Sequence, residues 1–345
     1  MFRRHVLYAR IRALAPLALM GGLLLYAVIP WLPISTSARP PRTIVLYGFS
    51  ILGDALNKGV FPAFQKEWRE KTGEHIELVS SFAGSGTVTN QILMGVPAQL
   101  ALLSLELDAM KLADRGLVGP AAWHSLPHGG IVNRTPFIIL VRPGNPKHIR
   151  DFRDLGAPGV EIVHPDPLTS GGANWAIVAE YGAGFREPGG GAAGGFEVLR
   201  GLWRNVVAQA ASARAARTQF ENGFGDALVT YEQEALYDLS RGKLKSEIVY
   251  PRRTILSEHT LVRIDHNITP SDKPLIDAFV RFLWTDAAQS AFLRYGFRSV
   301  DEERNGHFHL IEDPFRVSDF GGWKKAKAEI VDAVWKARVL KELGK

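Results

Sequence analysis

Two short turns contain the residues that are best suited to chemistry in this sequence. One is "SFAGSGTVTN" (81–90), with Ser85 and Gly86, and the other is "HPDPLTSGGANW" (164–175), with Ser170, Gly171 and Gly172. Glycines let a ligand come close to the main chain. A helix that begins at such a turn offers unpaired N–H groups and the positive end of its dipole. Both turns are therefore candidate anion-binding sites.

Each turn taken alone has a simpler explanation. Serine is a common N-cap residue, so a Ser–Gly pair before a helix can serve capping and nothing more. The same pattern occurs twice, however, each time between a predicted strand and a predicted helix. If two lobes present these turns to a shared cleft, hydrogen-bond donors would converge on a ligand from both sides.

Alternating strands and helices must position the two turns. Apolar runs predict strands at 43–49, 75–81, 100–105, 135–143, 159–165, 244–251 and 254–265, and a strand that passes into a helix at 227–239. Helical spacing predicts helices at 59–73, 86–95, 107–116, 174–182, 273–296 and 323–343. The Gly-rich stretch 186–197 is interpreted as a flexible loop. Strands that alternate with crossover helices predict an α/β architecture with mostly parallel sheets.

Length and composition limit the class of protein. A chain of 345 residues suits two lobes. The absence of cysteine excludes disulfides, thiolate metal sites and a cysteine nucleophile. The formal net charge is +6, and four arginines in residues 1–38, which contain no acid, supply +4 of it, so the remainder carries +2. A nearly neutral body without a Lys/Arg block argues against nucleic acid as a partner.

The N-terminus has the features of an export signal. Residues 1–12 are basic, residues 13–34 are apolar, and Thr36 and Ala38 suit the −3 and −1 positions of a cleavage site. Residues 1–38 are therefore predicted to be a signal peptide that is cleaved after Ala38. The alternative is an uncleaved membrane anchor, because the apolar run approaches the roughly 20 residues that span a bilayer. Either interpretation predicts a periplasmic location for residues 40–345.

Motifs for catalysis and metal binding are weak. The stretch "AGSGT" lacks the first glycine of the G-x-S-x-G nucleophile motif, and no His or Asp partner stands at a recognisable spacing. His307 and His309 have no third ligand at motif spacing, so a surface loop explains them better than a metal site. We therefore expect no enzymatic activity, no metal and no cofactor.

The two turns belong to a longer pattern that resembles the periplasmic sulfate/thiosulfate-binding family of ABC importers. The matching pieces extend over most of residues 43–330 and include "LDAMKLADRGLV", "LVRPGNPK", "PGVEIVHPDPLTSGGANW", "FENGFGDALVTYEQEAL" and "DFGGWKKAK", in that order. The resemblance implies an α/β, two-lobed periplasmic binding protein of type II, with a ligand cleft between the lobes. It also implies that the ligand is passed to an ABC permease in the inner membrane, and we expect the protein to be a monomer.

The resemblance also implies where the lobes divide. Lobe 1 would comprise residues 42–135 plus 263–345, and lobe 2 would comprise residues 140–250. Two crossover strands, near 135–142 and 250–262, would join them.

The ligand-binding positions follow residue by residue from the same resemblance. The family's serine in the first turn falls on Ser85, next to Gly86, and its Ser-Gly-Gly falls on Ser170, Gly171 and Gly172. Its third contact segment falls on Ala213 and Arg214. Most of these contacts are implied to come from main-chain N–H groups.

At two positions the chain departs from the family pattern. The family's Tyr-Asp in the first strand-to-helix turn is replaced by Ser50 and Ile51, where a main-chain contact to the anion can survive. A family tryptophan that donates its indole N–H to the ligand is replaced by Tyr231. Because a tyrosine hydroxyl can accept as well as donate, we expect weaker discrimination against protonated oxyanions.

The hydrogen-bonding character of these segments favours sulfate or thiosulfate. Sulfate carries no proton at neutral pH and only accepts hydrogen bonds, whereas monohydrogen phosphate must also donate one. Segments 84–86, 170–173 and 213–214 contain no Asp or Glu, although Glu232 follows Tyr231. The alternatives are the same fold with phosphate, molybdate or tungstate, or a membrane-anchored sensing module that passes nothing to a permease.

Overall fold

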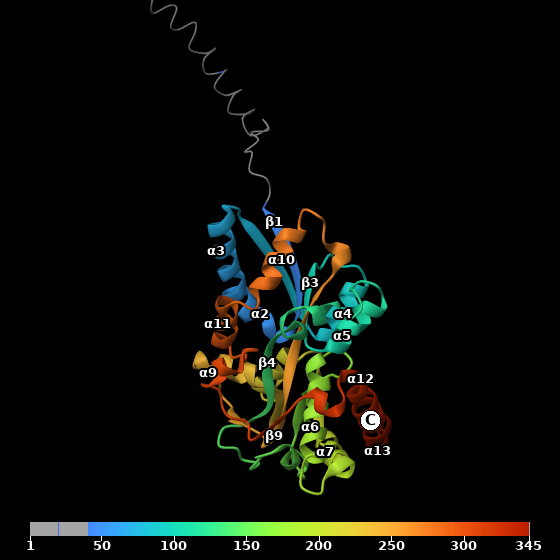
Figure 1. The fold of residues 1–345 in the computed structure, drawn as a ribbon. Coiled ribbons are helices and arrows are strands. Elements are labelled where there is room, and N and C mark those ends of the chain that lie inside the picture. Colours follow the sequence, from blue (N-terminus) through green and yellow to red (C-terminus); the bar gives the residue numbers. More distant parts are fainter. Residues whose placement is uncertain (1–19, 21–40, 345) are drawn as a thin grey trace, which may run out of the picture. The chain divides into compact units, whose positions relative to one another are not determined.

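Ten strands form one mixed sheet in the part of the chain that the computed structural model describes, which is residue 20 and residues 41–344 (Figure 1). The strands are β1 (Arg42–Phe49), β2 (Ile76–Ala83), β3 (Leu100–Leu103), β4 (Ile131–Val141), β5 (Ile162–Pro165), β6 (Val206–Ala210), β7 (Ala227–Tyr231), β8 (Glu247–Val249), β9 (Arg253–Arg263) and β10 (Asp313–Phe315). Their order is β2-β1-β3-β9-β4-β7-β5-β6, with β8 beside β4 and β10 beside β9. Together with the intervening helices, this arrangement confirms the predicted α/β class.

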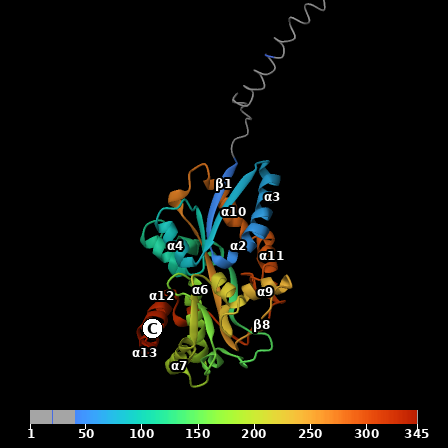
Figure 2. The ribbon, with the colours of Figure 1, turned by 180° about the vertical axis from the view of Figure 1, so that it is seen from behind.

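The first group of strands positions the turn that contains Ser85. Strand β1 pairs in parallel with both β2 and β3, and its alternate residues Ile44 and Leu46 are completely buried. Figures 1 and 2 show the surrounding helices, which are α2 (Gly53–Ala55), α3 (Phe61–Thr72), α4 (Ser85–Leu93), α5 (Glu106–Asp114), α10 (Lys273–Phe282) and α11 (Asp286–Arg294).

The second group of strands positions the turn that contains Ser170. Strand β5 pairs in parallel with β6 and β7. Its helices are α6 (Gly171–Phe185), α7 (Gly191–Arg204), α8 (Ala213–Glu221) and α9 (Glu232–Ser240). Helix α6 is buried along residues 171–184, which explains why its sequence is apolar on every side.

Strands β4 and β9 take part in both groups. Residues 260–263 of β9 pair with β3, and residues 256–260 pair with the first half of β4. The second half of β4, residues 137–141, pairs with β7. All of these pairings are antiparallel, so the predicted mostly parallel sheet is interrupted at its centre by two strands that run between the groups. The division into lobes stays a proposal.

The C-terminal helical segment packs against the second group. It consists of α12 (Trp323–Ala326), the π-type segment η10 (Lys327–Leu340) and α13 (Lys341–Leu343). Segment η10 contacts α6 and α7, and Trp335 packs edge-on against Trp203 with ring centroids 4.9 Å apart. Figures 1 and 2 both show α12 and α13 beside α6 and α7. This contact favours a grouping of residues 323–343 with 140–250 within the proposed division into lobes.

Short helical turns complete the described chain. They are η2 (Ser50–Leu52), η3 (Leu56–Val60), η4 (Ala122–Ser125), η5 (Pro127–Gly130), η6 (Phe152–Gly156), η7 (Asp265–Asn267), η8 (Glu302–Asn305) and η9 (Val317–Phe320).

Two sequence-based assignments are corrected. The Gly-rich stretch 186–197 is not a loop throughout, because α7 begins at Gly191 and buries Phe196, Leu199 and Trp203. Burial of this apolar face outweighs the poor helix propensity of the glycines. The predicted helix 273–296 is divided into α10 and α11, because Thr285 caps a new helix with its side chain.

Within the described part of the chain, no helix combines the length and hydrophobicity that crossing a bilayer requires. The predicted signal peptide or anchor, residues 1–38, lies outside the described residues except for Met20.

Candidate anion-binding site

Three helices, α4, α6 and α8, begin at one place in the fold. Gly84 is the N-cap of α4, and a Cβ atom added to it would lie 2.3 Å from Thr169 O and 2.6 Å from Ala211 O. These two carbonyl groups come just before α6 and α8, and Thr169 Oγ1 also donates to Ala211 O at 2.9 Å. Only glycine permits this close approach. The positive ends of three helix dipoles therefore converge between the two groups of strands.

The Ser-Gly-Gly turn, residues 170–172, lies directly against the turn that contains Ser85. Ser170 is the N-cap residue of α6, and its side chain makes no capping hydrogen bond. A Cβ atom on Gly171 would lie 2.8 Å from Ser104 Oγ and 3.0 Å from Ser85 Cβ, and one on Gly172 would lie 3.0 Å from the Tyr231 hydroxyl. The structure thus brings the two Ser/Gly turns together, as expected, while their role toward a ligand stays a prediction.

The first main-chain N–H groups of α6 and α8 supply donors at this place. Gly171 and Gly172 are the first two residues of α6, and Ala213 and Arg214 are the first two residues of α8. N–H groups at these positions have no partner within their own helix. Within residues 41–344 none of the four donates to another main-chain or side-chain acceptor. They are suited to hold the oxygen atoms of an anion.

The Ser85 side chain and the Gly86 amide are engaged within the protein. Ser85 Oγ donates to Asp108 Oδ2 at 2.7 Å and accepts a hydrogen bond from Ser104 N at 3.1 Å. Gly86 N donates to Thr169 O at 3.1 Å, and this bond joins α4 to the loop before α6. In this structure, the Ser85 side chain therefore links α4 to α5 within the first group, whereas Gly86 joins this group to the second.

The Arg214 guanidinium is also engaged within the protein. Its Nε donates to Glu234 Oε1 at 2.9 Å, and its Nη1 donates to Asp54 Oδ2 at 3.3 Å. Burial opposes its charge, but the carboxylates of Glu234 and Asp54 keep the pKa of Arg214 above its ordinary value. Burial would likewise raise the pKa of Asp54, but hydrogen bonds from Lys58, Tyr237 and Arg214 hold it below its ordinary value. Two carboxylates thus hold the guanidinium, while within the described residues the main-chain N–H of Arg214 is unpaired and can serve a ligand.

Tyr231 is buried at the end of β7, where its hydroxyl lies 2.8 Å from Ser104 Oγ. Its ring packs against Phe137 and Phe49, with centroid separations of 4.5 and 6.2 Å. Burial raises the pKa of Tyr231, so that the phenol stays neutral over the physiological range. Ile51 lies in turn η2, which contacts α8, and its fully buried side chain is part of the apolar core.

Ser104 and Asp108 are the two polar residues of this cluster that the sequence analysis did not identify. A signal was available, because Ser104 directly follows β3 and precedes α5, the same strand-to-helix position that Ser85 and Ser170 occupy. Without a neighbouring glycine, "LLSLELD" does not stand out as an anion-binding turn.

A cavity of about 490 Å³ opens beside the cluster. Gly86, Asp108, Ser170 and Gly171 are among the residues that line it. Its lining also contains three lysines, Lys111, Lys324 and Lys327. Lys111 pairs with Asp108 at 3.0 Å, and Lys327 pairs with Asp332. Because Asp114 also lines this cavity and two of the three lysines are paired with aspartates, positive and negative side chains are mixed in its walls.

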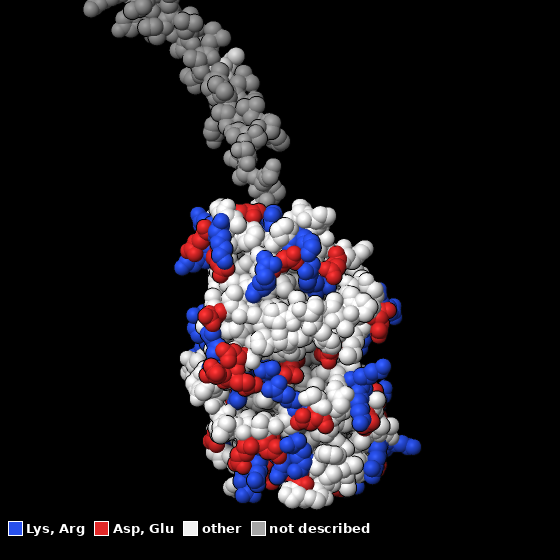
Figure 3. Space-filling view, in the orientation of Figure 1, with Lys and Arg blue, Asp and Glu red and all other residues white. Residues whose placement is uncertain are grey.

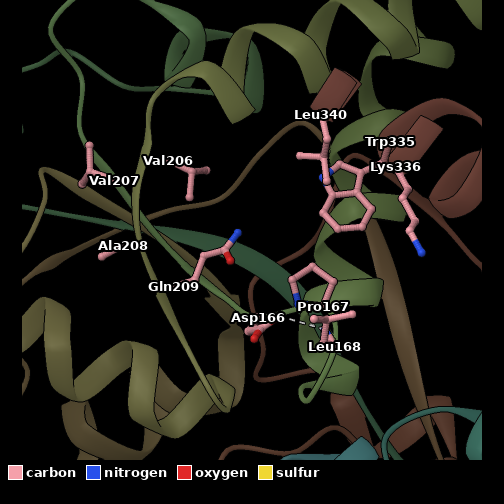
Figure 4. Close-up of a pocket in the computed structure, with 10 residues that line it drawn as sticks. All are labelled: Asp166, Pro167, Leu168, Val206, Val207, Ala208, Gln209, Trp335, Lys336 and Leu340. Atoms are coloured by element: carbon pink, nitrogen blue, oxygen red, sulfur yellow. Dashed lines mark hydrogen bonds between the residues drawn. The ribbon is translucent and has the colours of Figure 1, made fainter. Parts of the chain in front are cut away.

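A second cavity, of about 540 Å³, lies on the other side of the loop 166–168. Figure 4 shows it between β6 and the C-terminal segment, with Trp335 and Leu340 facing Val206 and Gln209. Its walls are mainly apolar, and they contain no set of converging N–H groups at the start of a helix. This composition does not suit a doubly charged anion.

Other classes of ligand find less support. On the face shown in Figure 3, positive and negative side chains are interspersed over the described residues. Among those residues, no group of three or more His, Asp or Glu side chains could hold a metal ion.

Comparisons with known proteins identify a family model and several relatives that this chain matches. The family model described as bacterial extracellular solute-binding protein matches residues 52–298. A sulfate-binding protein of Synechococcus elongatus is 30% identical over 307 residues, which cover 87% of each chain. A thiosulfate-binding protein of Pseudomonas aeruginosa is 29% identical over 313 residues, covering 87% of this chain and 93% of that protein. The solved structure of the sulfate-binding protein SubI from Mycobacterium tuberculosis is 29% identical, with a TM-score of 0.76, and the match covers 84% of this chain and 99% of that one.

Proposed function

The chain belongs to the family of bacterial extracellular solute-binding proteins, and we propose that it captures a tetrahedral oxyanion, sulfate or thiosulfate, for import by an ABC permease. The similarity to proteins named for binding sulfate and thiosulfate supports this choice of ligand.

The observation that carries the proposal is the convergence of α4, α6 and α8. Gly171, Gly172, Ala213 and Arg214 offer four main-chain N–H groups within the region where these helices begin. A fully deprotonated dianion needs only donors, and main-chain N–H groups cannot act as anything else. Because these groups are fixed by the helices, binding requires little reorganisation of the site.

The proposed capture is a closure of two lobes over the anion. Strands β4 and β9 would act as the connection between the lobes, since both strands pair with elements on each side. The bonds from Gly86 to Thr169 and from Arg214 to Asp54 would form on closure and exclude water from the bound anion. We assign no catalytic step to the protein and no cofactor to the site.

The location and partners follow from the same proposal. The protein would act in the periplasm as a monomer and deliver its ligand to a permease in the inner membrane. The basic and apolar N-terminal segment supports export, through either a cleaved signal or an anchor.

Calorimetric titration of the purified protein with sulfate, thiosulfate, phosphate, molybdate and tungstate tests the choice of ligand. We expect sulfate or thiosulfate to bind with a dissociation constant of about 1 μM or below, which corresponds to roughly 8 kcal/mol. Perchlorate, a tetrahedral monoanion, serves as the control and should bind far more weakly. If neither sulfate nor thiosulfate gives heat, while molybdate or tungstate does, the proposed ligand is wrong.

A further inference from the structure

Four buried polar side chains form a continuous series behind the first turn of α6. Asp108, Ser85, Ser104 and Tyr231 are each only 1% exposed. Ser85 Oγ donates to Asp108 Oδ2 at 2.7 Å, Ser104 N donates to Ser85 Oγ at 3.1 Å, and Ser104 Oγ lies 2.8 Å from the Tyr231 hydroxyl. The series therefore runs from a carboxylate on α5 to a phenol at the end of β7.

The Ser85 hydroxyl has no proton left for a ligand. It carries a single proton, which it gives to Asp108, and the N–H of Ser104 occupies one of its lone pairs. Asp108 cannot return a proton as a carboxylate, because it only accepts hydrogen bonds, and its other oxygen is paired with Lys111 Nζ at 3.0 Å. The side chain of Ser85 is thus fixed in the interior of the protein.

The hydroxyl groups of Ser104 and Tyr231 have a proton to spare. They carry two protons between them, and the hydrogen bond that joins them uses only one. Both lie against the first turn of α6, because added Cβ atoms would lie 2.8 Å from Ser104 Oγ at Gly171 and 3.0 Å from the Tyr231 hydroxyl at Gly172. The pair can turn its remaining proton toward a ligand, or turn it away and present a lone pair.

We propose that Ser104 and Tyr231 form the side-chain part of the anion site, and that they let it bind singly protonated oxyanions such as monohydrogen phosphate and arsenate as well as sulfate. Asp108 is then a positioning residue, which acts through Ser85 and keeps the Ser85 proton away from the ligand. This inference rests on the proposed function, because it assumes that the anion is held at the start of α6.

The wild-type protein alone provides the first test. Sulfate and phosphate are titrated calorimetrically at a mildly alkaline pH, where inorganic phosphate is mainly the monohydrogen form. We expect the two affinities to lie within roughly a hundredfold of each other. A site that leaves the ligand's proton unpaired would reject phosphate by more than about a hundredfold, because a buried unsatisfied donor on a charged group costs about 3 kcal/mol or more. Sulfate binding with rejection of phosphate by that factor would overturn the inference and leave the proposed function intact, whereas no binding of either anion would count against the proposed function.

Three variants test the individual residues. Ser104→Ala and Tyr231→Phe should each weaken the binding of both anions by roughly tenfold, because the remaining hydroxyl keeps its one proton but loses the partner that orients this proton toward the ligand. Tyr231→Trp should raise the ratio of sulfate to phosphate affinity, since an indole N–H only donates. If Ser104→Ala and Tyr231→Phe both fold, as judged by circular dichroism, and bind both anions as tightly as the parent, neither hydroxyl touches the ligand.

Asp108→Asn tests the positioning role. An amide can donate to Ser85 Oγ, which frees the serine proton for the ligand. We expect the ratio of sulfate to phosphate affinity to increase, a change that a loss of stability alone would not produce. An unchanged ratio in a folded Asp108→Asn protein would overturn the positioning role.

Discussion

At the scale of single residues, Arg214 shows how a sequence position and a side-chain role can differ. The position is at the start of α8, a helix that the sequence analysis did not predict, and the guanidinium bridges Glu234 and Asp54, which stand 20 and 160 residues away in the chain. No local pattern indicates partners at such separations. The same reason applies to Ser104 and Asp108, whose hydrogen bonds are made to residues on other elements.

Arg214→Met should weaken both the fold and anion binding. The substitution removes the link to Asp54 and leaves the buried Glu234 with Arg217 alone. We expect the free energy of unfolding to fall by about 1–3 kcal/mol, and the affinity for sulfate to fall with it. Urea denaturation and calorimetry measure the two effects. Arg153→Met is the matched control, because Arg153 pairs with Glu187 at an exposed site and should change unfolding by less than about 0.5 kcal/mol.

If Arg214→Met matches Arg153→Met in both measurements, the contact with Asp54 contributes nothing to closure.

At the scale of elements, the sequence predicted the strand-to-helix turns. It predicted the strands of the sheet only in part. The apolar run before Ser170 and the glycines after it identify β5 and α6 from sequence. Strand β6, residues 206–210, was missed, because exposed and partly buried residues alternate over only five positions at the edge of the sheet. Helix α7 was partly missed, since tertiary packing outweighs the propensity of its glycines.

Gly171→Ala should damage the start of α6 even though alanine is the better helix former. The added Cβ atom would lie 2.8 Å from Ser104 Oγ and 3.0 Å from Ser85 Cβ, so the turn must move away from both. We expect sulfate affinity to fall at least about tenfold, or roughly 1.4 kcal/mol. Gly306→Ala is the control, because nothing lies within 4 Å of its added Cβ and its φ of −61° suits alanine. Equal affinities in the two variants would place the ligand away from α6.

Strand β9 contains a buried histidine, next to β4, that should make the free energy of unfolding depend on pH. His259 of β9 lies 2.6 Å from Asn133 Oδ1 of β4 through its Nδ1, and burial lowers the pKa of His259 to about 3. In the unfolded chain its pKa is about 6.5. Below about pH 6.5, His259 is therefore protonated in the unfolded state, whereas in the native state it stays neutral down to about pH 3. The free energy of unfolding then falls by up to roughly 1.4 kcal/mol for each unit by which the pH is lowered.

The measurement is urea denaturation at several values between about pH 5 and pH 7, where model carboxylates remain mostly ionised. His259→Gln should flatten the decline, while His266→Gln, at an exposed position beyond β9, should leave it as in the parent. A decline that is equally steep in His259→Gln and the parent would contradict the buried neutral histidine.

At the scale of the whole molecule, the α/β class and the meeting of the two Ser/Gly turns could be predicted from sequence, but the placement of the C-terminal segment could not. Segment η10 packs on α6 and α7, where Trp335 contacts Trp203, and amphipathic spacing alone does not specify this contact. The proposed lobes would therefore be intertwined, since residues 327–340 pack on the helices of the lobe that contains Ser170.

Export should leave a mature protein that begins at Arg39. Thr36 and Ala38 are the small residues that suit a cleavage site. N-terminal sequencing of the protein isolated from its native host decides between the two interpretations, and a chain that begins at Met1 would mean that the segment is retained as an anchor.

The central claim, that an anion is held where α4, α6 and α8 begin, is tested most directly by a crystal structure of the protein with selenate. Selenate has the shape and charge of sulfate, and selenium gives an anomalous signal that locates it without ambiguity. The account predicts one strong anomalous peak within hydrogen-bond reach of the N–H groups of Gly171 and Gly172. A peak in the apolar cavity beside Trp335, or no peak inside the protein under conditions where calorimetry detects binding, would contradict it.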